Sequence, residues 1–418
     1  MKARDRDFDD FRRFVAPLLP ARVQAFGEPG RVQQAGGLEL VADDGRRVLD
    51  FLAGWGTQPF GHRPAAVEAR LREFLDGREP ALYTSGVSPY AGRLARVLCE
   101  RSGLGRAFFA SGGTEAVEAA VKLARAATGH QRILCLEGAY HGCTLGSLAL
   151  MTGGPFRAPF GPHLPAVESL PFGDADALRA ALERGPPAAA VVVEPVQVEG
   201  GVRPVGEGYL AALGEEADRR GFVLVADEIQ TGLGRMGRFL ASEAWPRRPD
   251  AVVLGKALGG GLMPVSCLLG DARLFDRAYG TPETAEIHYS TFGGNSPACV
   301  AALATLEALD APLMAAAAGA RLAERLAGAL RGCRAVKAVR GAGLLAGIEL
   351  DGGGPSSLGL WLCRRLLRAG YYTGLCAHDA STVRVHPPLT VSQAEIGAFV
   401  EVVEREMHLL ERSGPRDP

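Results

Sequence analysis

The 418-residue sequence lacks the features that mark several large classes of protein. It contains no run of the roughly 18 uncharged apolar residues that a membrane-spanning helix needs. Its first residues, MKARDRDFDDFRRF, carry both signs of charge and lack the apolar core of a signal peptide. The formal net charge is −1, so no overall field attracts nucleic acid or an anionic membrane. We therefore expect neither nucleic acid nor a membrane among its partners.

Paired cysteines are also missing. The eight cysteines are scattered along the chain and none forms a CxxC pair, so the sequence indicates neither a zinc site nor a disulfide framework. Isolated cysteines in a chain of this length typically act as small buried apolar residues of a reducing compartment. We expect a cytoplasmic protein that binds no metal.

From about residue 60 onward, the sequence alternates short apolar runs with helical patterns. Fully apolar strands that alternate with helices predict a mostly parallel sheet with helices on both faces, which is an α/β fold. The predicted strands are residues 106–110, 132–136, 188–193, 222–226 and 251–254, and the clearest helical patterns are 114–127 and 208–220.

This pattern divides the chain into three parts. Residues 1–60 form an N-terminal arm and a segment of a smaller domain, with a hairpin turn at Asp43-Asp44-Gly45 between apolar runs. Residues 61–296 form the large domain. A long Ala/Leu-rich linking helix at 297–330 opens the last part, residues 297–418. That part is a smaller α+β domain with strands at 343–350 and 382–385 and a helix at 359–369.

Chemically reactive side chains follow two of the predicted strands. Strand 222–226 runs directly into Asp227, and strand 251–254 runs through one glycine into Lys256. Ligands of parallel α/β sheets gather beyond the carboxyl ends of the strands, so we expect both side chains to face one crevice. A third segment, ASGGTE at 110–115, follows a strand and opens a helix. Free backbone N–H groups and the helix dipole favour a phosphate there.

A lysine, a carboxylate and a phosphate site on one rim are what pyridoxal phosphate (PLP) requires. The lysine forms a Schiff base with this cofactor and later moves protons. The carboxylate keeps the pyridine nitrogen protonated, so that the ring withdraws electrons. The large domain, residues 61–296, is therefore predicted to bind PLP.

Each of these elements alone has a commoner interpretation. An apolar strand that ends in Asp-Glu also describes the metal site of nucleotide hydrolases, but no G-x-x-x-x-G-K-[ST] segment accompanies it. The segment GLGRMG at 232–237 matches a dinucleotide-binding motif, yet it does not join a strand directly to a helix, and we interpret it as a loop. An NAD-dependent dehydrogenase and a non-catalytic cofactor-binding regulator remain as alternatives from other classes.

The same residues resemble the class III aminotransferases of PLP fold type I, the group of ornithine, acetylornithine and 4-aminobutyrate aminotransferases. The resemblance covers most of residues 45–390. Its motifs are SGGTEAVEAAVKLAR, AYHG, VVVEPVQVEGG, LVADEIQTGLGRMGRF, LGKALGGGLMPVS, STFGGNSPA and VRVHPPLT. It implies a fold-type I transaminase that moves an amino group between an amino donor, such as glutamate, and a carbonyl acceptor. An aminomutase, racemase, decarboxylase or carbon–carbon bond-forming enzyme on the same fold stays open, because all begin from the same adduct of cofactor and substrate.

The resemblance also implies which residues hold the cofactor. Lys256 and Asp227 would be the catalytic pair, with Lys256 attached to PLP and Asp227 paired with the ring nitrogen. Gln230 would contact the ring 3-hydroxyl, and Tyr140 would stack on the ring face. The remaining implied cofactor contacts are Gly113, Thr114, His141, Glu194 and Thr291, of which Thr291 would reach the phosphate of the neighbouring subunit in a homodimer.

Four further positions are implied to bind the substrate. Arg384 would fork onto a substrate carboxylate, and Glu199 would neutralise Arg384 when a substrate without that carboxylate is bound. Trp55 occupies an aromatic position at the entrance. Cys143 stands where ornithine and acetylornithine enzymes carry an arginine. Because a cysteine cannot fork onto a carboxylate, we expect a different substrate.

Overall fold

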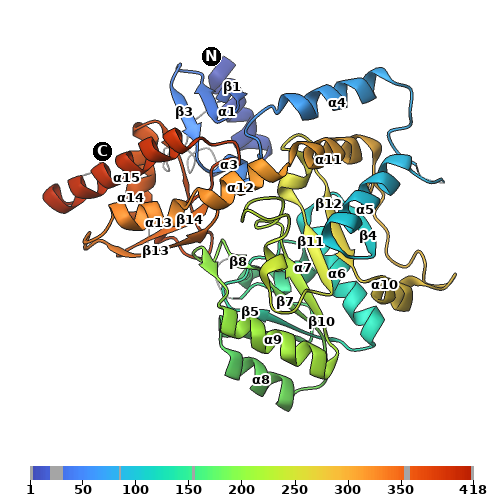
Figure 1. The fold of residues 1–418 in the computed structure, drawn as a ribbon. Coiled ribbons are helices and arrows are strands. Elements are labelled where there is room, and N and C mark those ends of the chain that lie inside the picture. Colours follow the sequence, from blue (N-terminus) through green and yellow to red (C-terminus); the bar gives the residue numbers. More distant parts are fainter. Residues whose placement is uncertain (1–2, 19–31, 84–85, 153–155, 353–357, 416–418) are drawn as a thin grey trace.

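The computed structural model describes residues 3–18, 32–83, 86–152, 156–352 and 358–415. A large central sheet with helices on both of its faces lies beside a smaller region that contains both ends of the chain (Figure 1). This is the α/β arrangement predicted from the sequence.

The central sheet has seven strands in the order β4-β12-β11-β10-β7-β5-β6. Neighbouring strands are parallel except at β12, which runs antiparallel to both β11 and β4 and was not among the predicted strands. Residues 255–265, which include the short 3₁₀ turn η3 (Lys256–Gly259), separate β11 from β12, and this is less chain than the dozen or more residues that a parallel crossover needs. The strands are β4 (Arg106–Ala110), β5 (Arg132–Leu136), β6 (Val167–Leu170), β7 (Ala188–Val193), β10 (Val223–Asp227), β11 (Ala251–Leu254) and β12 (Ser266–Gly270).

Alternate residues of the strands supply two separate cores, one on each face of the sheet. In β10, Val223 and Val225 pack with helices α6 and α10, whereas Leu224 and Ala226 pack with α8 and α9. Fully apolar strands are therefore required, as the sequence pattern predicted. The covering helices are α5 (Pro89–Ser102), α6 (Gly113–Thr128), α8 (Ala175–Arg184), α9 (Glu207–Arg220) and α10 (Ala272–Tyr279).

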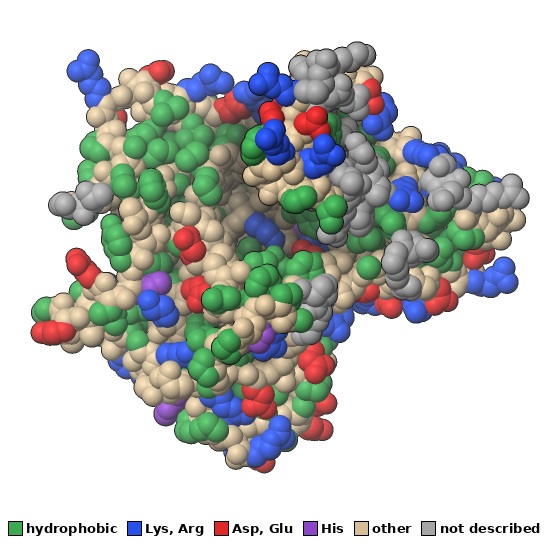
Figure 2. Space-filling model, turned by 180° about the vertical axis from the view of Figure 1, so that it is seen from behind, with side chains coloured by type: hydrophobic (Ala, Val, Ile, Leu, Met, Phe, Trp, Pro, Cys, Tyr) green, Lys and Arg blue, Asp and Glu red, His purple; other side chains and the backbone are tan. Residues whose placement is uncertain are grey.

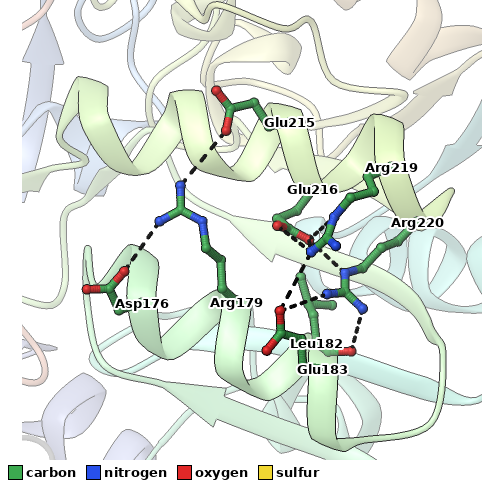
Figure 3. A network of polar contacts seen from close by, with 8 residues as sticks. All are labelled: Asp176, Arg179, Leu182, Glu183, Glu215, Glu216, Arg219 and Arg220. Atoms are coloured by element: carbon green, nitrogen blue, oxygen red, sulfur yellow. Dashed lines mark hydrogen bonds and ion pairs between the residues drawn. The ribbon is translucent and has the colours of Figure 1, made fainter.

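Charged side chains join α8 to α9 on the outside of the sheet (Figure 3). Arg220 donates to the Leu182 carbonyl at 2.8 Å and to Glu216 at 2.6 Å, and Arg179 lies 3.9 Å from Glu215. Glu216 is buried, whereas Arg179 and Glu215 are exposed, and an exposed ion pair contributes little, on the order of 0–1 kcal/mol. The network fixes how the two helices lie against each other and is remote from the strand ends that carry the reactive residues.

The smaller region is assembled from both ends of the chain. Its first sheet pairs β3 with β15 in parallel, which joins the N-terminal segment to the C-terminal part. The strands of this sheet are β1 (Val32–Gly36), β2 (Glu39–Ala42), β3 (Arg47–Asp50) and β15 (Tyr371–Tyr372). The second sheet contains β13 (Val336–Ala342), β14 (Leu345–Leu350), β16 (Gly374–Leu375) and β17 (Thr382–Val385), with helices α14 (Leu358–Arg368) and α15 (Gln393–Ser413) beside it.

The stretch 297–330 is not one long helix but three: α11 (Ser296–Ala308), α12 (Ala311–Gly319) and α13 (Leu322–Ala329). The first break occurs at Asp310, whose side chain accepts the Leu313 amide at 2.8 Å and so starts a new helix. The second occurs at Arg321, which has a left-handed φ of 46°. Among the described helices, none alone is long and apolar enough to cross a membrane. The helices at Ser296–Ala308 and Ala311–Ala329 are long and apolar enough only when taken together, and they are bent by 74° relative to each other.

The remaining short elements connect these layers. They are α1 (Ala3–Phe14), α3 (Ala53–Gly56), α4 (Ala65–Asp76), α7 (Leu145–Ala149), η1 (Ala158–Phe160), η2 (Ala241–Ala244), β8 (Val196–Gln197) and β9 (Arg203–Pro204). The segment GLGRMG is a loop between β10 and η2, as expected, and does not lead from a strand into an α-helix.

Candidate active site

The two reactive strand ends meet the N-terminus of α6, as the sequence predicted. Asp227 pairs in register with Val253 across β10 and β11, so Asp227 and Lys256 follow neighbouring strands at the same edge. A side-chain carbon added to Gly255 would lie 3.5 Å from the Gly113 Cα, which brings the backbone before Lys256 against the first turn of α6. Figure 2 shows a hollow near the middle of one face of the molecule, with Lys or Arg side chains at its floor.

The start of α6 offers backbone donors. The amides of Ser111 and Gly112 donate to the Glu115 carboxylate at 2.8 Å each, which caps the helix. Gly113 and Thr114 are the first two helical residues, whose N–H groups have no partner within the helix by position. The Gly113 backbone also packs closely on Ile229, since an added Cβ would lie 2.7 Å from Ile229 Cδ1. The arrangement suits a phosphate, because N–H groups and the helix dipole both point at it.

Asp227 belongs to a buried cluster with His141 and Glu194. Its Oδ2 lies 2.7 Å from His141 Nδ1, and its Oδ1 accepts the Ile229 amide at 3.1 Å. Burial opposes the imidazolium form of His141, but the hydrogen bond and the charges of Asp227 and Glu194 prevail and raise its pKa. Burial raises the pKa of Glu194 to about 8, and this carboxyl accepts the Tyr140 amide at 2.9 Å. His141 therefore orients and balances the charge of the Asp227 carboxylate.

Lys256 is held in a strained backbone conformation and has an unusually acidic ammonium group. Its φ is 42°, a left-handed value that residues with a side chain rarely adopt. Burial and the charge of Arg384 lower its pKa to about 8, although Glu199, Asp227 and Glu194 act in the opposite direction. This lowering increases the fraction of neutral amine near neutral pH. A neutral amine is the form that can act as a nucleophile or accept a proton.

Gln230 has neither of its polar atoms satisfied by the described residues. Its Oε1 and Nε2 are buried without a hydrogen-bond partner there, as are both ring nitrogens of His386. A Cβ on Gly56 would lie 2.7 Å from Gln230 Oε1 and 2.8 Å from His386 Cε1, so only glycine fits between them. Burying such groups unpaired costs about 1–3 kcal/mol each, which a ligand in the site would relieve.

Arg384 is completely buried and pairs with Glu199. Its Nη1 lies 2.5 Å from Glu199 Oε1, whereas its Nε and Nη2 have no partner among the described residues. The Trp55 ring covers the guanidinium, with 4.5 Å from Cζ to the ring centroid. Burial opposes ionisation of Glu199, but the charges of Arg384 and Lys256 and the Ala377 amide outweigh it and lower the pKa of Glu199. The free Nε–Nη2 edge is the shape that forks onto a carboxylate.

Tyr140 and Cys143 form a further part of the site. The Tyr140 hydroxyl is 3.2 Å from Cys143 Sγ, and its ring centroid is 6.0 Å from that of His378. The His378 amide donates to the Glu199 carbonyl at 2.9 Å, so this aromatic group lies next to the Arg384–Glu199 pair. Burial and the contact with Cys143 raise the pKa of Tyr140, which keeps its hydroxyl neutral.

Thr291 stands apart from these groups. It is exposed and lines a surface hollow of about 390 Å³ together with Ser111 and Glu115, on the outer side of the α6 start. Within the described part of one chain, Thr291 does not join the residues around Lys256. The role of Thr291 across a subunit interface stays a prediction.

The sequence analysis missed three residues that lie in this site or hold its residues in place: His386, Asp50 and His62. His386 follows Arg384 by two positions, and because side chains alternate along a strand, both lie on one face of β17 and its extension. That spacing was readable in VRVHPPLT. Asp50 and His62 had no comparable signal, since Asp50 accepts two backbone amides of a turn and His62 contacts Asp50.

These groups fit PLP as a set. Lys256 would carry it, Asp227 would face its ring nitrogen, Gln230 its 3-oxygen, and the amides of Gly113 and Thr114 its phosphate. When bound, PLP supplies an electron-withdrawing ring next to the carbon that bears the amino group. Among the described residues, no group of three or more His, Cys, Asp or Glu side chains is placed to hold a metal ion.

The fold and site together are those of a fold-type I PLP enzyme, and comparison with known proteins defines the family. The class III aminotransferase family model matches residues 26–407, so the chain belongs to that family, whose cofactor is PLP. The chain is 33% identical to the aminotransferase PigE of Serratia sp. (strain ATCC 39006), with 95% of this chain aligned but only 53% of PigE. It thus spans about half the length of that relative.

Two solved structures are similar over nearly the whole chain. The ornithine aminotransferase of Toxoplasma gondii ME49 superposes with a TM-score of 0.88 at 29% identity, covering 99% of this chain and 96% of that one. An amine transaminase from an uncultivated Pseudomonas species, determined in its PLP-bound form, gives a TM-score of 0.83 at 30% identity, covering 90% and 94%. The predicted family, fold type and cofactor are confirmed.

Proposed function

We propose that this protein transfers an amino group between a common amino acid, such as glutamate with its 2-oxo acid, and a less polar amine or carbonyl compound. Both half-reactions use one site in turn. The observation that carries the proposal is the buried Arg384, whose Nε–Nη2 edge is unpaired while Glu199 occupies only Nη1. A carboxylate binds this edge in one half-reaction, and Glu199 alone balances Arg384 in the other.

The chain's own residues supply positioning and proton transfer. Lys256, with its lowered pKa, accepts and returns the proton at the reacting carbon. Asp227, oriented by His141, would hold the proton on the ring nitrogen of bound PLP. Asp227, His141 and Glu194 are buried, so no water competes for these contacts.

The aromatic lining next to the Arg384–Glu199 pair favours an apolar second substrate. The rings of Tyr140, Phe156 and His378 form a group in which the Phe156 and His378 centroids are 5.6 Å apart. Cys143 is exposed beside Tyr140 and offers no guanidinium to a second carboxylate. N-acetylornithine should therefore be a poor substrate. A screen of amine donors against pyruvate and 2-oxoglutarate, one half-reaction at a time, identifies the pair that is used.

Replacing Arg384 with alanine should impair the keto-acid half-reaction at least about a hundredfold in kcat/KM, because two charged hydrogen bonds of about 1.5–3 kcal/mol each are lost. The half-reaction of an amine without a carboxylate should change little. Single-turnover absorbance of the cofactor in each half-reaction measures the two rates separately.

A matched variant separates the loss of the substrate contact from a loss of protein stability. Arg384→Ala leaves the Glu199 charge buried and unpaired, whereas Arg384→Gln with Glu199→Gln removes both charges. Both variants should lose the keto-acid half-reaction selectively. Equal losses in the two half-reactions, or efficient use of N-acetylornithine by the unmodified protein, would contradict the proposed function.

We also propose that the active unit is a cytoplasmic homodimer in which Thr291 completes the phosphate site of the neighbouring subunit. The segment around Thr291 carries exposed apolar side chains, namely Ile287, Tyr289 and Phe292 at 55%, 63% and 60% exposed. Exposed apolar side chains that gather in one segment favour a protein contact. For the compartment, the support is that all eight cysteines are free thiols.

On this proposal, Thr291→Ala should weaken PLP binding several-fold, since a neutral hydrogen bond contributes about 0.5–1.5 kcal/mol. Thr284→Ala is a change of the same size and should not weaken it, because within the described residues the Thr284 hydroxyl bonds to Thr281 alone. Equilibrium dialysis gives the affinity, and sedimentation gives the mass at assay concentration. A fully active monomer would rule out the dimer proposal.

A further inference from the structure

The turn that carries Trp55 has an unusual backbone. Four consecutive residues of α3 have positive φ: Ala53 at 48°, Gly54 at 55°, Trp55 at 62° and Gly56 at 87°. This is a left-handed helical turn, a conformation that L-residues with side chains disfavour because Cβ approaches the following carbonyl. Ala53 and Trp55 bear that strain, so surrounding contacts must impose it.

Asp50 supplies those contacts. It is the last residue of β3, its side chain is only 2% exposed, and its two oxygens accept the Leu52 and Gly54 amides at 2.9 Å each. Its Oδ2 also lies 2.9 Å from His62 Nε2. His62 is itself held by backbone hydrogen bonds to Gly37, the residue that follows β1, at 2.7 and 2.9 Å. The carboxylate thus connects a rigid sheet to the amides of the turn.

The left-handed turn places the Trp55 side chain against Arg384. The indole covers the guanidinium and rests against Gly374 of β16, where an added Cβ would lie 3.6 Å from Trp55 Cη2. Trp55 is nevertheless 44% exposed, so packing around the ring alone does not hold it there. The hydrogen bonds from the turn to Asp50 hold the ring in place.

We propose that Asp50, oriented by His62, is a positioning residue for substrate recognition. It imposes the left-handed turn that sets Trp55 on Arg384, and Trp55 in turn orients the Nε–Nη2 edge that binds the substrate carboxylate. The inference rests on the proposed function of Arg384, and it assigns a role to two residues that touch neither substrate nor cofactor.

The test uses the PLP-loaded full chain with Trp245→Phe and Trp361→Phe, which leaves Trp55 as the one tryptophan. In this background, Asp50→Asn presents an amide N–H where the turn needs an acceptor, and His62→Leu removes the support of Asp50. Both should increase acrylamide quenching of Trp55 fluorescence toward the level of an Arg384→Met variant. Glu39→Gln is a carboxylate-to-amide change in the same sheet, and it should leave the quenching unchanged, because within the described residues the Glu39 carboxylate pairs with the exposed Arg47.

Kinetics then separate positioning from folding. Asp50→Asn should raise KM for the keto acid by between about 5-fold and 30-fold, the range expected when a cation–π contact is lost. It should leave kcat and the half-reaction of an amine without a carboxylate nearly unchanged. Combined with Trp55→Leu, Asp50→Asn should add nothing further, because both changes act through the same contact.

Unchanged quenching in both Asp50→Asn and His62→Leu would overturn the inference, and so would additive losses in the double variant or equal losses in the two half-reactions. If Asp50→Asn does not fold, His62→Leu decides the question on the same readouts. Failure of every keto acid with the unmodified protein would instead refute the proposed function. The quenching comparison would still tell whether Asp50 places Trp55.

Discussion

Replacing Lys256 with alanine is expected to abolish amino transfer while leaving PLP bound without a covalent link. The amine is the group that accepts and returns a proton, and its pKa of about 8 leaves a neutral fraction that grows as the pH rises through that value. Alanine keeps the amides of Gly113 and Thr114 and the Asp227 carboxylate, so the cofactor retains its other contacts. Loss of a general base alone typically costs 10²–10⁴-fold in rate, and here covalent attachment is lost as well.

Borohydride reduction of the unmodified protein followed by peptide mapping measures the attachment. The other lysines are Lys2, Lys122 and Lys337. Lys122 Nζ lies 2.7 Å from His288 Nδ1, and Lys337 pairs with Asp351 at 3.0 Å, so neither is placed at the Asp227 rim. Lys337→Ala serves as the control and should keep full turnover. Label on Lys122 or Lys337, or turnover in Lys256→Ala, would show that the lysine has been misassigned.

The catalytic pair could be predicted from the sequence because it depends on local pattern plus one general rule. The sequence itself shows one apolar strand that ends at Asp227 and another that ends just before Lys256. Parallel strands present their carboxyl ends on one edge of the sheet. The same holds for the α6 start, where glycines precede a clear helical pattern. Family resemblance then extended the prediction to Gln230, Glu199 and Arg384.

Features that arise from the order of the strands could not be read in this way. Glu194 has a raised pKa because β7 lies next to β10, which buries it near Asp227, and nothing in VVVEP fixes that neighbour. The Glu199–Arg384 contact joins residues 185 positions apart. The breaks in stretch 297–330 were missed because high Ala and Leu content outweighed the capping signal of Asp310.

The left-handed turn at 53–56 illustrates a different limit. Gly54 and Gly56 in AGWG permit positive φ, but Ala53 and Trp55 do not favour it, so local propensity predicts an ordinary turn. The conformation follows from Asp50 accepting two amides, a contact between backbone and a buried carboxylate that residue patterns do not encode. Places where local preference is overruled are where functional constraints are expected.

Changing Asp227 to asparagine should lower turnover by at least about a hundredfold and leave the fold intact. The side chain is 4% exposed, and its charge is what holds a proton on the group that faces it. Removing one partner of a buried charged pair costs about 3–5 kcal/mol, because the other charge stays buried. The amide has nearly the same shape, so Ile229 keeps an acceptor and the packing of β10 is retained.

His141 provides a readout for Asp227 that does not depend on turnover. Its pKa is raised by the hydrogen bond and charge of Asp227 against the effect of burial, so without that charge burial prevails and the pKa falls. Imidazole NMR titration of the PLP-loaded protein should therefore show His141 neutral at a lower pH in Asp227→Asn than in the unmodified protein. Asp250→Asn is the matched control, because Asp250 accepts the Leu224 amide at 2.8 Å and pairs with Arg247. The loss of the Asp250 carboxylate should reduce stability. It should change neither the His141 titration nor the rate per folded molecule. Near-normal turnover with an unchanged His141 pKa in Asp227→Asn would mean that another carboxylate faces the ring nitrogen.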